Sequence, residues 1–234
     1  MGYTPRVMAE ILLIAFGYVL GSVPTGVLAG RLFGVDVRAV GSGNIGTANV
    51  LRAAGKKAAI LTLAGDMLKG FVPVIVARLV TENAWVVALV ALAAVAGHCW
   101  PVFLKFRGGK AVATGAGTSI GLDPIVGLGL FAFWWIVVLI SRYTSLGAIS
   151  VMLVSPLAFW LTGQPIPYVI YTLVGGALVL WRHRENARAL LAGTERKVGQ
   201  KAEDRQDPAA GTGAGNGTDP TANREASRKV EKEA

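Results

Sequence analysis

Charged residues are scarce in this chain of 234 residues, since Asp, Glu, Lys and Arg together make up only 16%. Soluble domains usually carry about 25%. With 53% apolar residues, the composition excludes an ordinary soluble protein and indicates an integral membrane protein. The net charge of +9 does not indicate a nucleic-acid partner, because the basic residues flank apolar runs, as the positive-inside rule expects.

Cysteine and histidine are almost absent. The single cysteine, Cys99, excludes a disulfide framework or a thiolate metal cluster within one chain. The two histidines, His98 and His183, are too few for a histidine-rich metal site. A cleavable signal peptide is not predicted, because the first apolar run, residues 7–32, is too long and lacks a basic leader.

Long apolar runs fill most of the first 181 positions. A spanning helix needs roughly 20 apolar residues. We predict such helices over residues 7–32, 58–80, 83–103, 124–140, 145–161 and 167–181. A shorter apolar segment, residues 111–122, either crosses the membrane or re-enters it.

Charge favours a crossing by the short segment. Seven spans would place these basic residues on one side: Arg31, Arg38, Arg52, Lys56, Lys57, Lys105, Arg107, Lys110, Arg142, Arg182, Arg184 and Arg188. Only Arg6 and Arg78 would lie near the membrane on the other side. We therefore predict an all-α, polytopic bundle of seven transmembrane helices with the N-terminus outside and the C-terminus cytoplasmic. Residues 1–199 would form the membrane domain, and residues 200–234, which lose apolar periodicity, a disordered cytoplasmic tail.

Two features inside the apolar runs predict helix packing. Small residues recur at four-residue spacing, which lets helix backbones approach closely in lipid: Gly17 and Gly21, Gly26 and Gly30, Gly117 and Gly121. Asp66 and Lys69 lie three positions apart within residues 58–80. A lone charge at that depth costs about 2.5–3.5 kcal/mol, so we expect the two side chains to pair.

Three polar segments, residues 41–57, 98–114 and 182–199, hold both histidines and most of the clustered Lys, Arg and Gly. Such loops are tolerated in a bilayer protein where they meet water or line a cavity. Gathered on one membrane face, they would form a basin of backbone N–H groups and positive charge suited to phosphate.

The first segment combines glycines with polar side chains. Gly41, Gly43 and Gly46 can turn backbone amides toward an anion in a concave nest. The donors beside them are Ser42, Asn44, Asn49 and Arg52, whose guanidinium offers a planar fork for two phosphate oxygens. The alternative is a polar loop that only caps the next helix. A dinucleotide fingerprint (Gly-x-Gly-x-x-Gly, residues 41–46) is rejected, because it requires a strand before it.

In the second segment, Gly108 and Gly109 are expected to open a helix whose free amides attract anions, with Lys110 adding a mobile charge. His98 alone is more typical of a structural histidine. In the third segment, His183 and Asn186 share a helix face. His183 could transfer a proton and Asn186 could orient a substrate hydroxyl. The alternative is that this segment is a basic helix that contacts lipid headgroups. Ser145 is a donor candidate or simply an N-cap.

Together the three segments resemble the bacterial acyl-phosphate:glycerol-3-phosphate acyltransferases, the PlsY family, over nearly the whole chain up to Gly199. The matching residues of the first motif are Ser42, Gly43, Asn44, Gly46, Asn49 and Arg52; those of the second are Gly97, His98, Pro101, Phe103, Phe106, Gly108, Gly109, Lys110 and residues 112–114; those of the third are His183, Asn186, Leu190, Gly193 and Glu195. Residues 142, 143 and 145 match a further family element.

The chain departs from the family pattern at three positions. Ala111 stands where glycine is usual, and Ala48 where threonine is common, with Thr47 before it. Ala189 stands where the third motif usually has arginine, and Arg188 is adjacent.

The resemblance implies transfer of a fatty acyl group from acyl phosphate to the 1-hydroxyl of sn-glycerol 3-phosphate, giving 1-acyl-glycerol 3-phosphate and phosphate, the first acylation of phospholipid synthesis. It implies catalytic roles for Lys110, His183 and Asn186. Substrate binding would fall to Ser42, Gly43, Asn44, Gly46, Asn49, Arg52, Gly108, Gly109, Ser145 and Gly193. The proton acceptor is either His183 or a substrate phosphate oxygen.

The implied partners are the two substrates, membrane lipids and the soluble enzyme that forms acyl phosphate, with no cofactor, no metal and no nucleic acid. The expected location is the inner membrane of a bacterial cell, with the site facing the cytoplasm. The alternative function is a polytopic transporter of small phosphorylated anions, although the two related halves common in transporters are not apparent.

Overall fold

The computed structural model describes residues 5–200, and within that range the chain is helical with no strand. The elements are α1 (Pro5–Gly21), α2 (Thr25–Leu32), α3 (Thr47–Val80), α4 (Ala84–Cys99), a 3₁₀ turn (Val102–Leu104), α5 (Val112–Leu122), α6 (Pro124–Ser141), α7 (Thr144–Leu161), α8 (Ile166–Arg182) and α9 (Arg184–Leu191). All but residue 200 of the tail predicted over 200–234 lies outside the described residues.

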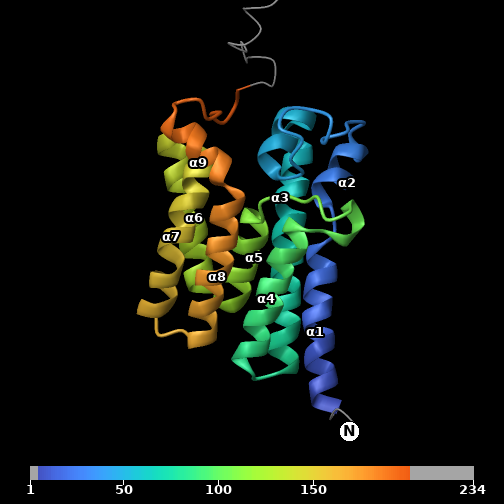
Figure 1. Cartoon of the computed structure of the whole chain (residues 1–234), viewed down its shortest axis with the longest axis vertical. Helices are drawn as coiled ribbons and strands as arrows, with labels where there is room; N and C mark the ends of the chain where they lie inside the picture. Colours follow the sequence, from blue (N-terminus) through green and yellow to red (C-terminus); the bar gives the residue numbers. More distant parts are fainter. Residues whose placement is uncertain (1–4, 201–234) are drawn as a thin grey trace, which may run out of the picture. The chain divides into compact units, whose positions relative to one another are not determined.

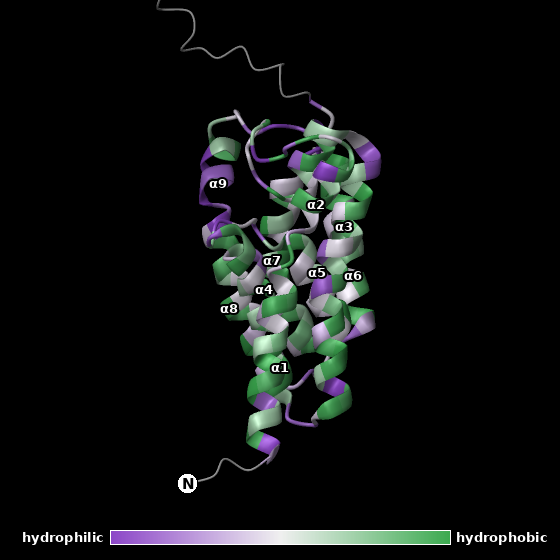
Figure 2. Cartoon of the chain, turned by 90° about the vertical axis from the view of Figure 1, so that its right-hand side faces the viewer, coloured by the Kyte–Doolittle hydropathy of each residue, from purple (hydrophilic) through white to green (hydrophobic). Residues whose placement is uncertain are grey.

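The long helices lie side by side in a bundle, with α1 against α4, α3 against α5, and α7 in contact with both α6 and α8 (Figure 1). Five segments are long and apolar enough to cross a membrane by length and composition: Pro5–Leu32, Thr47–Val80, Ala84–Leu104, Pro124–Ser141 and Thr144–Leu161. Helix α8 is a shorter apolar helix. Hydrophobic residues dominate the helices, whereas hydrophilic residues gather at the end of the bundle that carries α9 (Figure 2).

The first predicted helix, residues 7–32, is broken in the structure. Helix α1 ends at Gly21 and α2 begins at Thr25, because Pro24 has no N–H to continue the ladder. The break frees backbone groups that have no water to bind inside a bilayer. The Val23 carbonyl accepts a hydrogen bond from the Lys69 ammonium of α3 at 2.8 Å, so a buried charge satisfies the broken backbone.

Helix α3 begins earlier than predicted, at Thr47 rather than residue 58, but it is two helices joined at a kink. Gly55 has φ +82° and ψ −177°, which lies outside helical geometry. Residues before the kink belong to the polar end, and those after it match the predicted span. Helix α4 also differs, since it ends at Cys99 instead of continuing to residue 103.

Helix α5 matches the predicted short segment almost residue for residue. Its eleven residues rise only about 16 Å at 1.5 Å per residue. Arg78, near the C-terminus of α3, donates to the carbonyls of Gly121 (2.8 Å) and Leu122 (3.1 Å) at the C-terminus of α5. The C-terminus of α5 therefore lies beside the C-terminus of α3.

Five of the six glycines predicted to lie at helix contacts do so, whereas Gly30 packs against the loop between α2 and α3. A Cβ at Gly21 would lie 2.3 Å from the Ala94 carbonyl oxygen of α4, and one at Gly117 would lie 2.0 Å from the Met67 carbonyl oxygen of α3. Gly17, Gly26 and Gly121 also contact a neighbouring helix. At Gly17, Gly21 and Gly117, glycine lets two helices approach backbone to backbone.

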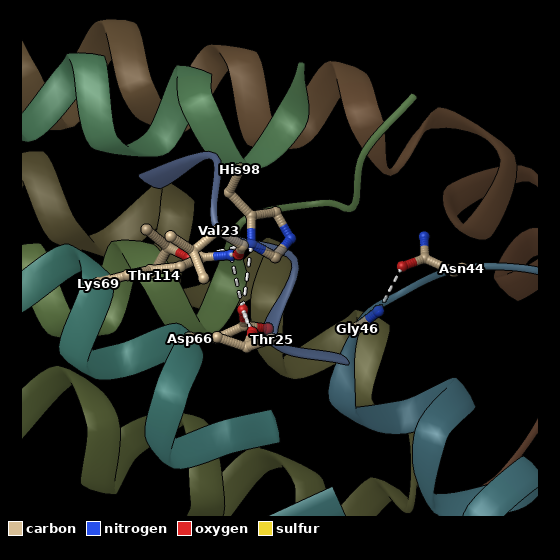
Figure 3. A network of polar contacts seen from close by, with 8 residues as sticks. All are labelled: Val23, Thr25, Asn44, Gly46, Asp66, Lys69, His98 and Thr114. Carbon is tan, nitrogen blue, oxygen red and sulfur yellow. Dashed lines mark hydrogen bonds and ion pairs between the residues drawn. The ribbon is translucent and has the colours of Figure 1, made fainter. Parts of the chain in front are cut away.

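Asp66 and Lys69 form the predicted ion pair, with Lys69 Nζ 2.8 Å from Asp66 Oδ1 and the Lys69 and Asp66 side chains only 3% and 2% exposed. The same carboxylate oxygen accepts a hydrogen bond from Thr25 of α2. His98 Nδ1 of α4 lies 3.5 Å away, within electrostatic reach (Figure 3). The pair thus connects the broken helix α1–α2, the span of α3 and the end of α4.

Removing one partner of this pair is expected to destabilise the protein more than removing both charges. Lys69→Ala leaves Asp66 buried without a counter-charge, which typically costs about 3–5 kcal/mol, and leaves the Val23 carbonyl with the Thr25 amide as its remaining donor. The double variant Asp66→Asn/Lys69→Met removes the uncompensated charge and should unfold closer to the wild-type temperature.

Thermal unfolding in detergent measures both effects. The matched control is Lys57→Ala, because Lys57 is an exposed lysine of the same helix. A Lys69→Ala protein that unfolds at the control's temperature would contradict the stabilising role of the pair.

Candidate functional site

Asn49 organises the first polar segment. Its Oδ1 accepts hydrogen bonds from Ser42 N (2.9 Å) and Ser42 Oγ (3.2 Å), and its Nδ2 donates to the Val37 (2.8 Å) and Val40 (3.1 Å) carbonyls. The side chain is 2% exposed, and two donors plus two acceptor positions exhaust an amide. Asn49 therefore stabilises the loop. Its side chain has no free polar atom left for the substrate contact that we expected.

The loop held by Asn49 turns sharply and ends at a helix start. Gly41 and Gly43 have positive φ values of +64° and +65°. Asn44 Oδ1 accepts from Gly46 N at 2.8 Å (Figure 3). Gly46 precedes α3, and no side chain caps that helix. The first amides of α3 consequently lie beside Ser42, Gly43 and Asn44, the arrangement that attracts anions.

The second segment folds back onto the end of α4. Gly108 N donates to the Cys99 carbonyl (3.2 Å) and Gly109 N to the His98 carbonyl (3.1 Å). Arg182 donates in turn to the carbonyls of Gly109 (3.1 Å) and Gly108 (3.0 Å). The expectation that these glycines open a helix with free amides is wrong, because both amides are engaged and α5 begins only at Val112.

The glycines are instead required for close packing. A Cβ at Gly109 would lie 2.2 Å from His98 Nε2, and one at Gly108 would lie 2.1 Å from the His98 carbonyl oxygen. His98 is buried, with Nδ1 3.1 Å from Thr114 Oγ1. These are the surroundings of a structural histidine, as expected. Ala111, which replaces the family's glycine, has φ +59°, a left-handed conformation that glycine adopts without strain.

A chain of hydrogen bonds joins the second and third segments. Lys110 donates to Asn186 Oδ1, and Asn186 Nδ2 donates to Glu195 Oε1 at 2.7 Å. The same Glu195 oxygen accepts from Ser145 Oγ, at the start of α7, at 2.6 Å. Two side chains, from α7 and α9, thus meet at the Glu195 carboxylate, and Lys110 joins them through Asn186.

The turn after α9 brings Glu195 into this chain. Gly193 has φ +69°, and the amides of Thr194 (2.8 Å) and Glu195 (3.1 Å) both donate to the Ala189 carbonyl. The backbone therefore reverses direction, and Glu195 points back toward Asn186. Gly193, expected to bind substrate, has a turn-forming role in the structure.

The ammonium group of Lys110 is partly buried and is influenced by both acidic and basic neighbours. Burial lowers the pKa of Lys110 below its usual value, Glu195 and Glu185 oppose that shift, and Arg182 and Arg52 add to it. A lysine with a reduced hydration shell and nearby cations is an effective site for an anion.

His183, between α8 and α9, is 5% exposed. Its Nδ1 is 2.8 Å from the Val179 carbonyl oxygen, an acceptor only, so Nδ1 carries the hydrogen and Nε2 is left as an acceptor. Burial lowers the pKa of His183 to about 4, and the positive charge of Lys110 adds to that shift against the opposing hydrogen bond to Val179. The imidazole is therefore neutral near pH 7.

Arg52, in the first part of α3, lies near Glu195 and Arg196, close enough for their charges to act on it. Glu195 and Arg196 were not among the site residues expected from the sequence. The position of Glu195 in the third motif could have identified it as a site residue, whereas no sequence pattern indicated Arg196. Within residues 5–200, no group of three or more His, Cys, Asp or Glu could hold a metal ion.

Comparison with known proteins finds one family over most of the chain. The family model described as glycerol-3-phosphate acyltransferase matches residues 11–193. A glycerol-3-phosphate acyltransferase of Rubrobacter xylanophilus is 73% identical over 192 residues, which cover 82% of this chain and 96% of the relative. One from a strain of Thermus thermophilus is 43% identical over 197 residues, covering 84% of this chain and 99% of the relative.

Two crystal structures of PlsY (YgiH), an integral membrane glycerol 3-phosphate acyltransferase, share the fold. The glycerol 3-phosphate form has a TM-score of 0.79 at 41% identity and covers 82% of this chain and 96% of that chain. The lysophosphatidic acid form has a TM-score of 0.77 at 39% identity, with 81% and 95% covered. The present chain is an integral membrane protein that belongs to the glycerol-3-phosphate acyltransferase family.

Proposed function

We propose that this protein transfers a fatty acyl group from acyl phosphate to the 1-hydroxyl of sn-glycerol 3-phosphate, the first acylation of phospholipid synthesis. The observation that carries the proposal is the hydrogen-bonded chain from Lys110 through Asn186 and Glu195 to Ser145. It gathers donors from separate segments beside Arg52 and Arg182, where two phosphate-bearing substrates need their repulsion neutralised.

The two phosphates would occupy adjacent parts of the site. Ser42, Gly43 and Asn44, at the uncapped start of α3, would hold the acyl phosphate. Arg52, Lys110, Ser145, His183 and Asn186 would hold glycerol 3-phosphate. Because Lys110 and Ser145 are already hydrogen-bonded within the site, substrate binding exchanges these internal partners for phosphate and hydroxyl oxygens.

The reaction needs no protein nucleophile, since an acyl phosphate is already activated. The glycerol hydroxyl oxygen attacks the acyl carbonyl carbon, an ester C–O bond forms, the bond from that carbon to the phosphate oxygen breaks, and phosphate leaves. The cationic groups stabilise the departing phosphate. The hydroxyl proton passes to a phosphate oxygen or to Nε2 of His183, the ring nitrogen that the Val179 hydrogen bond leaves unprotonated.

We propose seven crossings, with the N-terminus outside and the C-terminus in the cytoplasm of a bacterial cell. The position of the α5 C-terminus beside Arg78 supports a crossing between α4 and α6. The basic residues then lie on the cytoplasmic side, as the positive-inside rule requires. In this orientation the site opens toward the soluble enzyme that would supply acyl phosphate.

The donor test separates this function from transport. Purified protein given palmitoyl phosphate should release inorganic phosphate only when glycerol 3-phosphate is present, and palmitoyl-CoA should not substitute. Lys110→Ala should reduce kcat/KM by about 10²–10³-fold, the usual cost of losing one group that stabilises developing charge. The exposed Lys105→Ala is the control. Phosphate release independent of glycerol 3-phosphate, or full activity in Lys110→Ala, would refute the assignment.

Glu195 is expected to act by positioning. Glu195→Ala removes the acceptor shared by Ser145 and Asn186, and misplacement of reacting groups by about 1 Å can cost about 10²-fold in rate. Glu195→Gln keeps an acceptor oxygen and should recover part of kcat. Glu185→Ala, a carboxylate of α9 that is 78% exposed, should keep wild-type steady-state kinetics. Equal activity of Glu195→Ala and Glu185→Ala would exclude the positioning role.

His183 should titrate far below a free histidine, with its pKa lowered from 6.5 to about 4. The unfolded chain binds this proton near pH 6.5 and the folded chain only near pH 4, so the His183 contribution to stability declines as pH falls between those values. Nitrogen-15 NMR of histidine-labelled protein measures this directly, with the signal assigned by loss in His183→Gln. An imidazole that titrates near pH 6.5 in the folded protein would contradict the buried, neutral state.

A further inference from the structure

Two arginines beside the first polar segment carry buried N–H groups that lack a hydrogen-bond partner. Among residues 5–200, these groups are Nε of Arg52 and Nη1 of Arg196, and the Thr47 hydroxyl is also buried without a partner. Guanidinium groups are expensive to bury unpaired, since they lose hydration without gaining an acceptor. Thr47 and Arg52 belong to the first two turns of α3, and Arg196 reaches the loop before that helix. The unfilled donors indicate a place for an acceptor that the protein itself does not supply.

The charge of Arg196 also acts on Arg52. Burial lowers the pKa of Arg52, the positive charge of Arg196 lowers it further, and Glu195 opposes that shift. The Glu195 Oε1 atom already accepts from Ser145 and Asn186, and neither arginine forms a salt bridge within the described range. Two neighbouring positive groups with free hydrogen-bond donors form a favourable binding site for a multiply charged anion.

The position of Arg196 directs it inward, toward the loop that Asn49 supports. Its Nη1 lies 4.0 Å from the place that a Cβ of Gly41 would occupy. The neighbouring basic residues point elsewhere: Lys197 lies over the Tyr143 ring at 5.7 Å, and Arg188 is exposed on α9. Of the two basic residues between α9 and residue 200, Arg196 is therefore the one that reaches the first segment.

We infer that Arg196 and the Thr47 hydroxyl complete, with Arg52, a binding site for the phosphate group of one substrate. A phosphate offers three acceptor oxygens, and planar guanidinium forks match them in pairs. The identity of the ligand rests on the proposed function, whereas its negative charge follows from the unpaired donors alone. It assigns Arg196 and Thr47 to phosphate recognition, at positions where the sequence motifs indicated no ligand contact.

Steady-state kinetics of Arg196→Ala test the site, with KM for glycerol 3-phosphate and KM for palmitoyl phosphate measured separately. One of the two KM values should rise about tenfold or more, as expected for a lost charged hydrogen bond, with a smaller change in kcat. The substrate whose KM rises is the one whose phosphate is bound. Arg196→Lys, which keeps charge without the fork, should recover part of the affinity, and Thr47→Val should raise the same KM.

Arg188→Ala is the matched control and should leave both KM values unchanged. Binding is also measured without turnover, as the rise in unfolding temperature that inorganic phosphate produces, which Arg196→Ala should reduce. Because this variant removes a repulsive charge rather than a packed core group, it should fold; Arg196→Gln repeats the test with a side chain of similar length.

Unchanged KM values together with undiminished protection by phosphate in Arg196→Ala and Arg196→Gln would overturn the inference while leaving the proposed function intact. Wild-type protein that is protected by phosphate through Arg196, yet transfers no acyl group, would uphold the site and refute the function.

Discussion

The absence of water inside a bilayer forces every interruption of a helix to find its hydrogen-bond partners within the protein. The interruptions before α2 and α5 do so with basic side chains. Lys69 takes the carbonyl freed by the break at Pro24, and Arg182 takes two carbonyls of the hairpin before α5. The basic side chains that bind the unpaired backbone carbonyls thus lie where loops enter the bundle. The candidate site is built from the same loops and helix ends.

Support and chemistry are divided between different residues of the same motifs. Asn49, Gly108, Gly109 and Gly193 shape the backbone, whereas Lys110, Asn186 and Ser145 present polar groups joined through Glu195. A motif read as a row of ligand contacts therefore overstates the number of residues that meet substrate. Several conspicuous positions hold the others in place.

The apolar pattern predicted most of the helices, the close contacts of small residues and the Asp66–Lys69 pair, because each follows from lipid solvation and local spacing. It did not predict the break before α2, since one proline in an apolar run is compatible with either a kink or an interruption. Gly108 and Gly109 were assigned free amides because a hairpin closed onto the end of α4 depends on contacts distant in sequence. Glu195 and Arg196 were missed for the same reason, since the turn at Gly193 alone brings them inward.

The bond between Lys110 and Asn186 also has a consequence for selectivity. Phospholipid headgroups surround such a protein, and most are phosphodiesters with a single negative charge spread over two free oxygens. Any competitor must displace a neutral amide oxygen already in place, an exchange that favours a terminal phosphate with a second charge. The hydrogen bond between Lys110 and Asn186 would in this way select substrate phosphate over the phospholipids of the surrounding membrane.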